Sequence, residues 1–177
     1  MTPYRLAGFE MIEPSAEVDW PGEPDNLPNL VDLGIDVSFH RNVYQREVID
    51  ILPPIKTVAS PGFTACSGII VRDNDSGIPT FGHLQPEVMS FERHMQGRNI
   101  KNGEAAVLIG EASRPPDALW DLRDGRWGNI DTRVISFESG STWWAAVFDV
   151  MSGRVSIARR KPRQSILQYA AFPSKDR

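Results

Sequence analysis

The sequence has almost no cysteine: Cys66 is the only one in 177 residues. A single thiol excludes an internal disulfide and the multi-cysteine zinc and iron–sulfur sites. The three histidines, His40, His83 and His94, do not have the spacing of metal ligands. We therefore predict that the protein uses no metal. A chain of this length buries enough apolar surface to fold without cross-links.

Long apolar runs are missing as well. No stretch of 18 apolar residues occurs, which predicts that no transmembrane helix is present. The first 13 residues contain a proline and lack the basic segment and long apolar core of a Sec-type signal peptide. We expect a cytoplasmic protein, or one that is secreted without a cleaved signal.

Outside the N-terminal region, neither acidic nor basic residues are in large excess. Residues 1–32 carry seven acids and one base, while the whole chain has a net charge of −4. The remainder is too weakly basic to predict a nucleic-acid partner. One basic cluster lies near the C-terminus, and we interpret it as charges that guard a strand edge, with an acidic partner as the alternative. Its members are Arg154, Arg159, Arg160, Lys161 and Arg163.

Prolines are concentrated in the N-terminal region, where residues 1–30 hold five of the fourteen. Proline removes a backbone donor and fixes φ, so this region should form neither a long helix nor a central strand. We predict an acidic, proline-rich arm over residues 1–50 and one domain over residues 51–177.

Short apolar runs separated by turn dipeptides follow, and they outnumber the helical patterns. Helices are expected after Pro86 and over residues 115–121, and the pattern of residues 42–52 fits either a helix or a strand. Because no regular crossover helices separate the strands, we predict an α+β fold of mixed or antiparallel β-sheets, sandwich-like and flanked by short helices. The expected strands are 31–39, 55–60, 66–72, 78–83, 105–109, 133–138, 143–150 and 154–159.

The most informative arrangement is a cysteine followed by a histidine across a turn. Cys66 begins one predicted strand, and His83 ends the next, seventeen residues later. The turn signal at residues 74–77 predicts a hairpin that brings both to the same open end. A cysteine nucleophile needs a base within hydrogen-bond reach, so the two form a candidate catalytic pair. The alternative is that Cys66 is a small core residue and His83 a satisfied polar one.

The segment over residues 60–86 resembles the signature of the CheD family of chemoreceptor glutamine deamidases. It shares a hydroxyl residue, a glycine-containing loop, a cysteine that opens an apolar strand, and a histidine after a glycine-containing turn. The resemblance continues through an apolar strand at 104–110, a helix at 117–123 and a closing hairpin within 134–161. It covers about residues 55–161, and the fold is shared with deamidase toxins of the cytotoxic necrotizing factor type.

This resemblance implies a protein-glutamine deamidase in which Cys66 is the nucleophile and His83 the base. Ser60 stands where the family has a threonine and would orient His83, with Thr57 and Thr64 as the alternatives. The implied partner is a glutamine-bearing protein, and the implied setting is either chemoreceptor modification or a bacterial effector or toxin. No cofactor is implied, and the oligomeric state stays open.

Two other functions fit the same residues. One is a transglutaminase or amidase that uses the same cysteine. The other is a non-catalytic binding module, in which Cys66 belongs to the core and the Trp143–Trp144 pair marks an interface. Adjacent residues on a strand face opposite sides, so at least one of these tryptophans is expected in the core.

Overall fold

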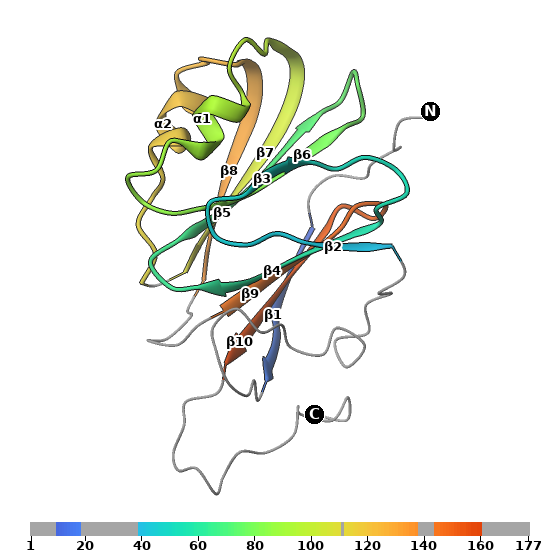
Figure 1. The fold of residues 1–177 in the computed structure, drawn as a ribbon, viewed down its shortest axis with the longest axis vertical. Coiled ribbons are helices and arrows are strands. Elements are labelled where there is room, and N and C mark those ends of the chain that lie inside the picture. Colours follow the sequence, from blue (N-terminus) through green and yellow to red (C-terminus); the bar gives the residue numbers. More distant parts are fainter. Residues whose placement is uncertain (1–9, 19–38, 111, 138–143, 161–177) are drawn as a thin grey trace, which may run out of the picture.

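The computed structural model describes residues 10–18, 39–110, 112–137 and 144–160, which form two facing β-sheets and two short helices (Figure 1). Sheet A has the strand order β1-β10-β9-β4-β2, and sheet B has the order β3-β6-β5-β7-β8. The strands of sheet A are β1 (Glu10–Val18), β2 (His40–Asn42), β4 (Thr57–Phe63), β9 (Trp144–Asp149) and β10 (Arg154–Arg160). Those of sheet B are β3 (Val48–Asp50), β5 (Ser67–Asp73), β6 (Pro79–Leu84), β7 (Ile100–Gly110) and β8 (Gly128–Phe137).

Both sheets are mixed. Neighbouring strands are mostly antiparallel, but β1 pairs with β10, β2 with β4 and β7 with β8 in parallel. The described fold is thus mostly β with two short helices, and the expectation of mixed sheets in an α+β arrangement is confirmed at that level.

Two apolar cores lie on the two faces of sheet B. Successive side chains of a strand point to opposite faces, and β5 shows this directly. Ile70 packs in the core between the two sheets, whereas Ile69 and Val71 pack in the core beneath the helices. Sheet B is therefore buried on both faces, and Figure 1 shows both helices on the face of it that lies away from sheet A.

The helices α1 (Ser90–His94) and α2 (Asp117–Arg123) are both short. Pro116 occupies the cap position of α2, as expected from its fixed φ. The first helix begins later than the sequence suggests, because the segment after Pro86 includes Glu87 with a φ of 70°. Such a left-handed residue does not continue a right-handed helix.

Strands β7 and β8 are longer than the expected 105–109 and 133–138. They pair in parallel from Ile100 opposite Gly128, over most of their lengths. Gly128 has a φ of 109°, and a Cβ built there would lie 2.1 Å from the Ile100 carbonyl oxygen. Only glycine permits this close start of the pairing.

Residues within 1–50 contribute three strands to the sheets. β1 lies at an edge of sheet A and pairs with β10, so β10 has a neighbour on both sides. The interpretation of the basic cluster as a guarded strand edge is therefore wrong for Arg154–Arg160. Lys161 and Arg163 lie outside the described residues.

The segment 42–52, which suits either state by its pattern, includes strand β3 and the last residue of β2. Most of the strand expected over 31–39 lies outside the described residues, and Phe39 itself sits in a turn with a φ of 58°. In the parts of the chain that the structure describes, no helix is long and apolar enough to cross a membrane.

Candidate active site

Strands β5 and β6 form the hairpin that the turn signal predicts. Gly68 lies opposite His83 and Ser67 opposite Leu84 in the antiparallel register. The turn closes with a hydrogen bond from the Gly77 amide to the Asp73 carbonyl. Cys66 immediately precedes β5, so it lies at the same end of the hairpin as His83.

Cys66 and His83 also face the same side of sheet B. Residues directly opposite each other share a face, as do residues two apart on one strand. His83 lies opposite Gly68, and Cys66 is two residues before Gly68. Cys66 and Ile70 both belong to the core between the sheets, which identifies that face. Cys66 and His83 are therefore diagonal neighbours across the hairpin. Gly68, which lies opposite His83 and two residues after Cys66, has no side chain.

Sheet A holds the imidazole of His83 from the other side. The Oγ of Ser60 in β4 lies 3.0 Å from Nδ1 of His83. The ring of Phe63 stacks on the imidazole with centroids 3.7 Å apart, and Trp144 stacks on the other face of Phe63 at 4.0 Å. Between Ser60 and Phe63 the pairing of β4 is irregular, and Gly62 has a φ of 77°. This bulge turns both side chains toward His83, although they are three residues apart.

The hydrogen bonds fix the tautomer of His83. Ser60 Oγ donates its proton to the Val43 carbonyl at 2.6 Å, so it accepts the proton of Nδ1. The other nitrogen, Nε2, therefore carries a lone pair, and it has no hydrogen-bond partner among the described residues. Burial lowers the pKa of His83 to about 3, so the ring is neutral at physiological pH.

Cys66 is covered by a different segment. Its side chain is buried with 3% of the residue exposed, and the Gln45 amide Nε2 donates to Sγ at 3.4 Å. Burial raises the pKa of the Cys66 thiol, and the Gln45 hydrogen bond and the Arg46 charge offset this only in part. No hydrogen bond joins Cys66 to His83, since Nε2 is unpartnered in the part of the chain described. The resting site therefore holds a thiol and a neutral imidazole.

The residues between β2 and β3 run along this end of the hairpin. The Arg46 amide donates to the His83 carbonyl at 2.9 Å, and the His83 amide donates to the Glu47 carbonyl at 3.0 Å. The Arg46 side chain reaches the Gln85 amide oxygen. This segment, residues 43–47, is called the cover loop below. Its contacts with Ser60, His83 and Cys66 come from four of its residues: Val43, Gln45, Arg46 and Glu47.

The two other hydroxyls that the sequence offered do not bind the imidazole. His83 bonds Ser60 at Nδ1 and has no described partner at Nε2, which leaves no bond to Thr57 or Thr64. Thr57 lies opposite Asp149 on β4, and the Thr64 carbonyl accepts from Ser113. Of the three candidates, Ser60 is the residue that the fold brings to His83.

The sequence does not predict three residues that contact this site. Phe63 lies within the segment 60–86, but nothing in its sequence context indicates that it stacks on a histidine. Val43 and Gln45 lie in the segment 42–52, whose pattern fits either a helix or a strand. Trp144 is fully buried in the stack, whereas Trp143 lies outside the described residues.

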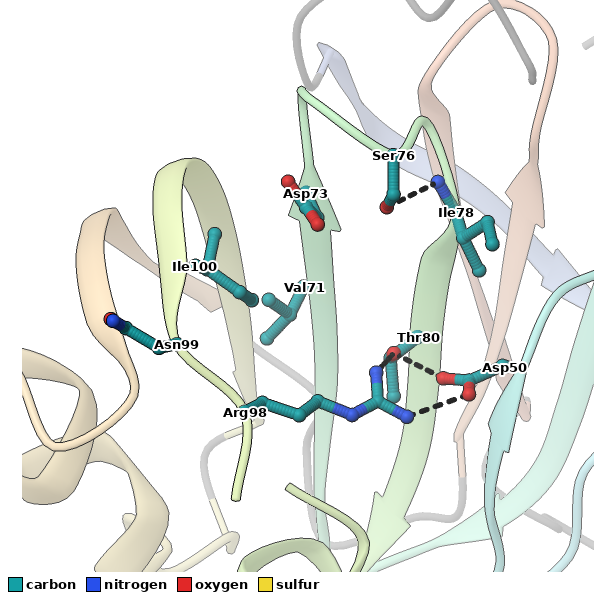
Figure 2. Close-up of a pocket in the computed structure, with 9 residues that line it drawn as sticks. All are labelled: Asp50, Val71, Asp73, Ser76, Ile78, Thr80, Arg98, Asn99 and Ile100. Carbon is teal, nitrogen blue, oxygen red and sulfur yellow. Dashed lines mark hydrogen bonds and ion pairs between the residues drawn. The ribbon is translucent and has the colours of Figure 1, made fainter. Parts of the chain in front are cut away.

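A second polar cluster lies toward the turn end of the same hairpin and lines a pocket of about 340 Å³. Figure 2 shows the Arg98 guanidinium directed at Asp50 and Thr80. It donates to Asp50 at 2.6 Å and to Thr80 at 3.2 Å. His94 bonds the same Asp50 at 3.0 Å. Among the residues described, no group of three or more histidine, cysteine, aspartate or glutamate side chains is placed to hold a metal ion.

Comparison of the chain with protein-family models and with curated proteins finds no match.

Proposed function

We propose that the protein is a glutamine deamidase that acts on proteins, with Cys66 as nucleophile and His83 as general base. One observation carries the proposal: a fully buried imidazole held at Nδ1 by Ser60, with an unpartnered Nε2 on the same face of the hairpin as Cys66. Buried polar atoms are nearly always satisfied, so an orphaned basic nitrogen beside a thiol suggests a function.

The tautomer suits a base. A neutral histidine whose Nδ1 proton is held by an acceptor presents Nε2 as the site that takes a proton. Ser60 is itself fixed by the Val43 carbonyl, so it cannot reverse its role and donate to Nδ1. The stack of Phe63 on the ring limits its rotation.

In the proposed reaction, His83 Nε2 takes the Cys66 proton as Sγ attacks the side-chain amide carbon of glutamine. The S–C bond forms, and the carbonyl electron pair moves to oxygen. The C–N bond then breaks, and the nitrogen leaves as ammonia with the proton returned by His83. Water, deprotonated by His83, hydrolyses the thioester to glutamate and restores the thiol.

The choice of a glutamine substrate is supported by the resemblance of residues 60–86 to the CheD signature. Two features of the structure support the same three residues: Ser60 Oγ lies 3.0 Å from Nδ1 of His83, and Cys66 lies on the same face of the hairpin as His83. The product gains a negative charge, which can change how a partner protein binds.

The test compares the parent with Cys66→Ser on unfolded casein and on benzyloxycarbonyl-Gln-Gly. We expect ammonia release and conversion of glutamine to glutamate, measured by mass spectrometry, with the parent alone. Equal urea midpoints would show that the variant is folded. Equal ammonia release by the two chains would reject the proposal. Faster incorporation of a supplied primary amine than hydrolysis would favour a transglutaminase instead.

One observation favours a non-catalytic binding module: Cys66 is almost fully buried and burial raises its pKa. A structural thiol behaves in this way, whereas a catalytic thiol must be reached by its substrate. Alkylation by iodoacetamide at neutral pH separates the two. Modification of the folded chain within minutes supports catalysis, and no modification over hours supports the binding module.

A further inference from the structure

The side-chain amide of Gln45 contacts the sulfur of Cys66. Nε2 donates to Sγ at 3.4 Å, although the two residues are 21 positions apart. The cover loop is anchored on both sides of this contact. Val43 accepts from Ser60 on one side, and the Arg46 amide donates to the His83 carbonyl on the other. Gln45 is thus held at Cys66 by the same residues that position His83.

A reaction at Cys66 needs a hydrogen-bond donor that this contact could supply. When Sγ bonds to a carbonyl carbon, the oxygen on that carbon becomes an oxyanion two bonds from the sulfur. A donor that already touches Sγ is then within reach of the oxyanion. A primary amide has two N–H groups, so donation to the oxyanion does not require the carbonyl end of Gln45.

We propose that Gln45 is a further catalytic residue, whose side-chain N–H stabilises the oxyanion formed when Cys66 attacks an amide. This inference rests on the proposed deamidase function. In the attack step His83 takes the thiol proton, the S–C bond forms, and the carbonyl electron pair becomes the oxyanion that accepts from Gln45. When the C–N bond breaks, that pair reforms the carbonyl and the hydrogen bond weakens.

The opposing explanation is that Gln45 only shields the sulfur. Gln45 is exposed while Cys66 is buried, so the Gln45 side chain lies where it could block access to the sulfur. Two substitutions separate the roles. Gln45→Met keeps a side chain of similar length without a donor, and Gln45→Ala removes both donor and cover. A matched control is Gln85→Met, since Gln85 also belongs to this end of the hairpin but bonds Arg46 and not Cys66.

The first measurement is deamidation of benzyloxycarbonyl-Gln-Gly. Loss of one oxyanion donor typically lowers kcat by about 10²–10³-fold. We expect that loss for Gln45→Met with KM changed by less than about threefold, and near-parental kcat for Gln85→Met. A parental kcat for Gln45→Met, or a higher kcat for Gln45→Ala, overturns the inference.

The second measurement needs no substrate. The rate of iodoacetamide alkylation against pH reports the thiolate of Cys66. Because the Gln45 hydrogen bond favours the thiolate, we expect the midpoint of this pH profile to lie at a higher pH for Gln45→Met than for the parent. An unchanged midpoint overturns the contact on which the inference rests. If parent and Cys66→Ser release ammonia equally, the deamidase proposal fails; if only the parent does and Gln45→Met matches it, this inference alone fails.

Discussion

Two histidines on the two sides of sheet B lie in opposite kinds of surroundings. His94 is partly exposed, and its Nε2 donates to Asp50 within a cluster that also includes Thr80 and Arg98. His83 is 1% exposed, and within the described part of the chain its ring forms one hydrogen bond, through Nδ1 to a serine hydroxyl. Both side chains help to join separate elements, but of the two only His83 has a buried ring nitrogen without a hydrogen-bond partner among the described residues.

The difference separates a structural cluster from a candidate site. In the Asp50 cluster each carboxylate oxygen accepts from a cation or a hydroxyl, so the charges compensate one another. Burial alone raises the pKa of Asp50, but the bonds from Arg98, His94 and Thr80 outweigh it and lower the pKa to about 2. At His83 burial acts unopposed. A satisfied network stabilises the fold, whereas an unsatisfied buried base costs stability and calls for a function.

The largest contrast between the two clusters is expected in activity. General acid–base catalysis typically contributes about 10²–10⁴-fold to a rate. We therefore expect His83→Asn to lower kcat for deamidation of benzyloxycarbonyl-Gln-Gly by that range, while His94→Asn leaves kcat within about twofold. Steady-state ammonia release measures both. If the two substitutions lower kcat equally, the assignment of the base to His83 does not hold.

A smaller effect, on stability, is expected at the Asp50 cluster. Asp50→Asn keeps the shape but leaves Arg98 without its carboxylate partner, and hydrogen bonds to charged groups contribute about 1.5–3 kcal/mol. Both side chains are about one-third exposed, so solvent screening reduces this to about 1 kcal/mol of unfolding free energy. Urea unfolding at pH 7 measures the loss. Iodoacetamide alkylation of Cys66 should keep the parental rate, and a slower or faster rate would show that the two clusters are coupled.

The parts of this comparison that the sequence predicts are local. The turn at residues 74–77 sets the register of β5 and β6, and a strand period of two then puts Cys66 and His83 on one face. The resemblance to the CheD signature favours Ser60 and leaves Thr57 and Thr64 as alternatives. The structure brings Ser60 to His83, because the bulge after Ser60 lets β4 reach the imidazole from the other sheet.

The parts that were missed depend on contacts between distant segments. Gln45 meets Cys66 only because the cover loop folds across the end of the hairpin, and no local pattern encodes this. The parallel pairing of β1 with β10 joins residues more than 130 positions apart, and Pro14, which lies within β1, argues against a strand at the level of sequence. The mistaken strand edge at Arg154–Arg160 has the same cause, since an edge depends on which strand lies beside it.

The last contrast is the pH dependence of stability, which should separate the two clusters by pH window. The pKa of His83 is lowered from 6.5 to about 3 by burial, so as the pH falls below 6.5 the unfolded chain binds a proton that the folded chain does not. The unfolding free energy then falls by at most about 1.4 kcal/mol per pH unit. Asp50, with a pKa lowered from 3.8 to about 2, loses its contribution only below about pH 4.

Burial raises the pKa of Glu92, which gives the opposite slope, so the informative quantity is the difference between parent and His83→Asn. Urea unfolding at pH 7, 6 and 5 should show a steeper loss in the parent, and parallel curves would mean that His83 binds a proton as readily in the folded chain as in the unfolded chain.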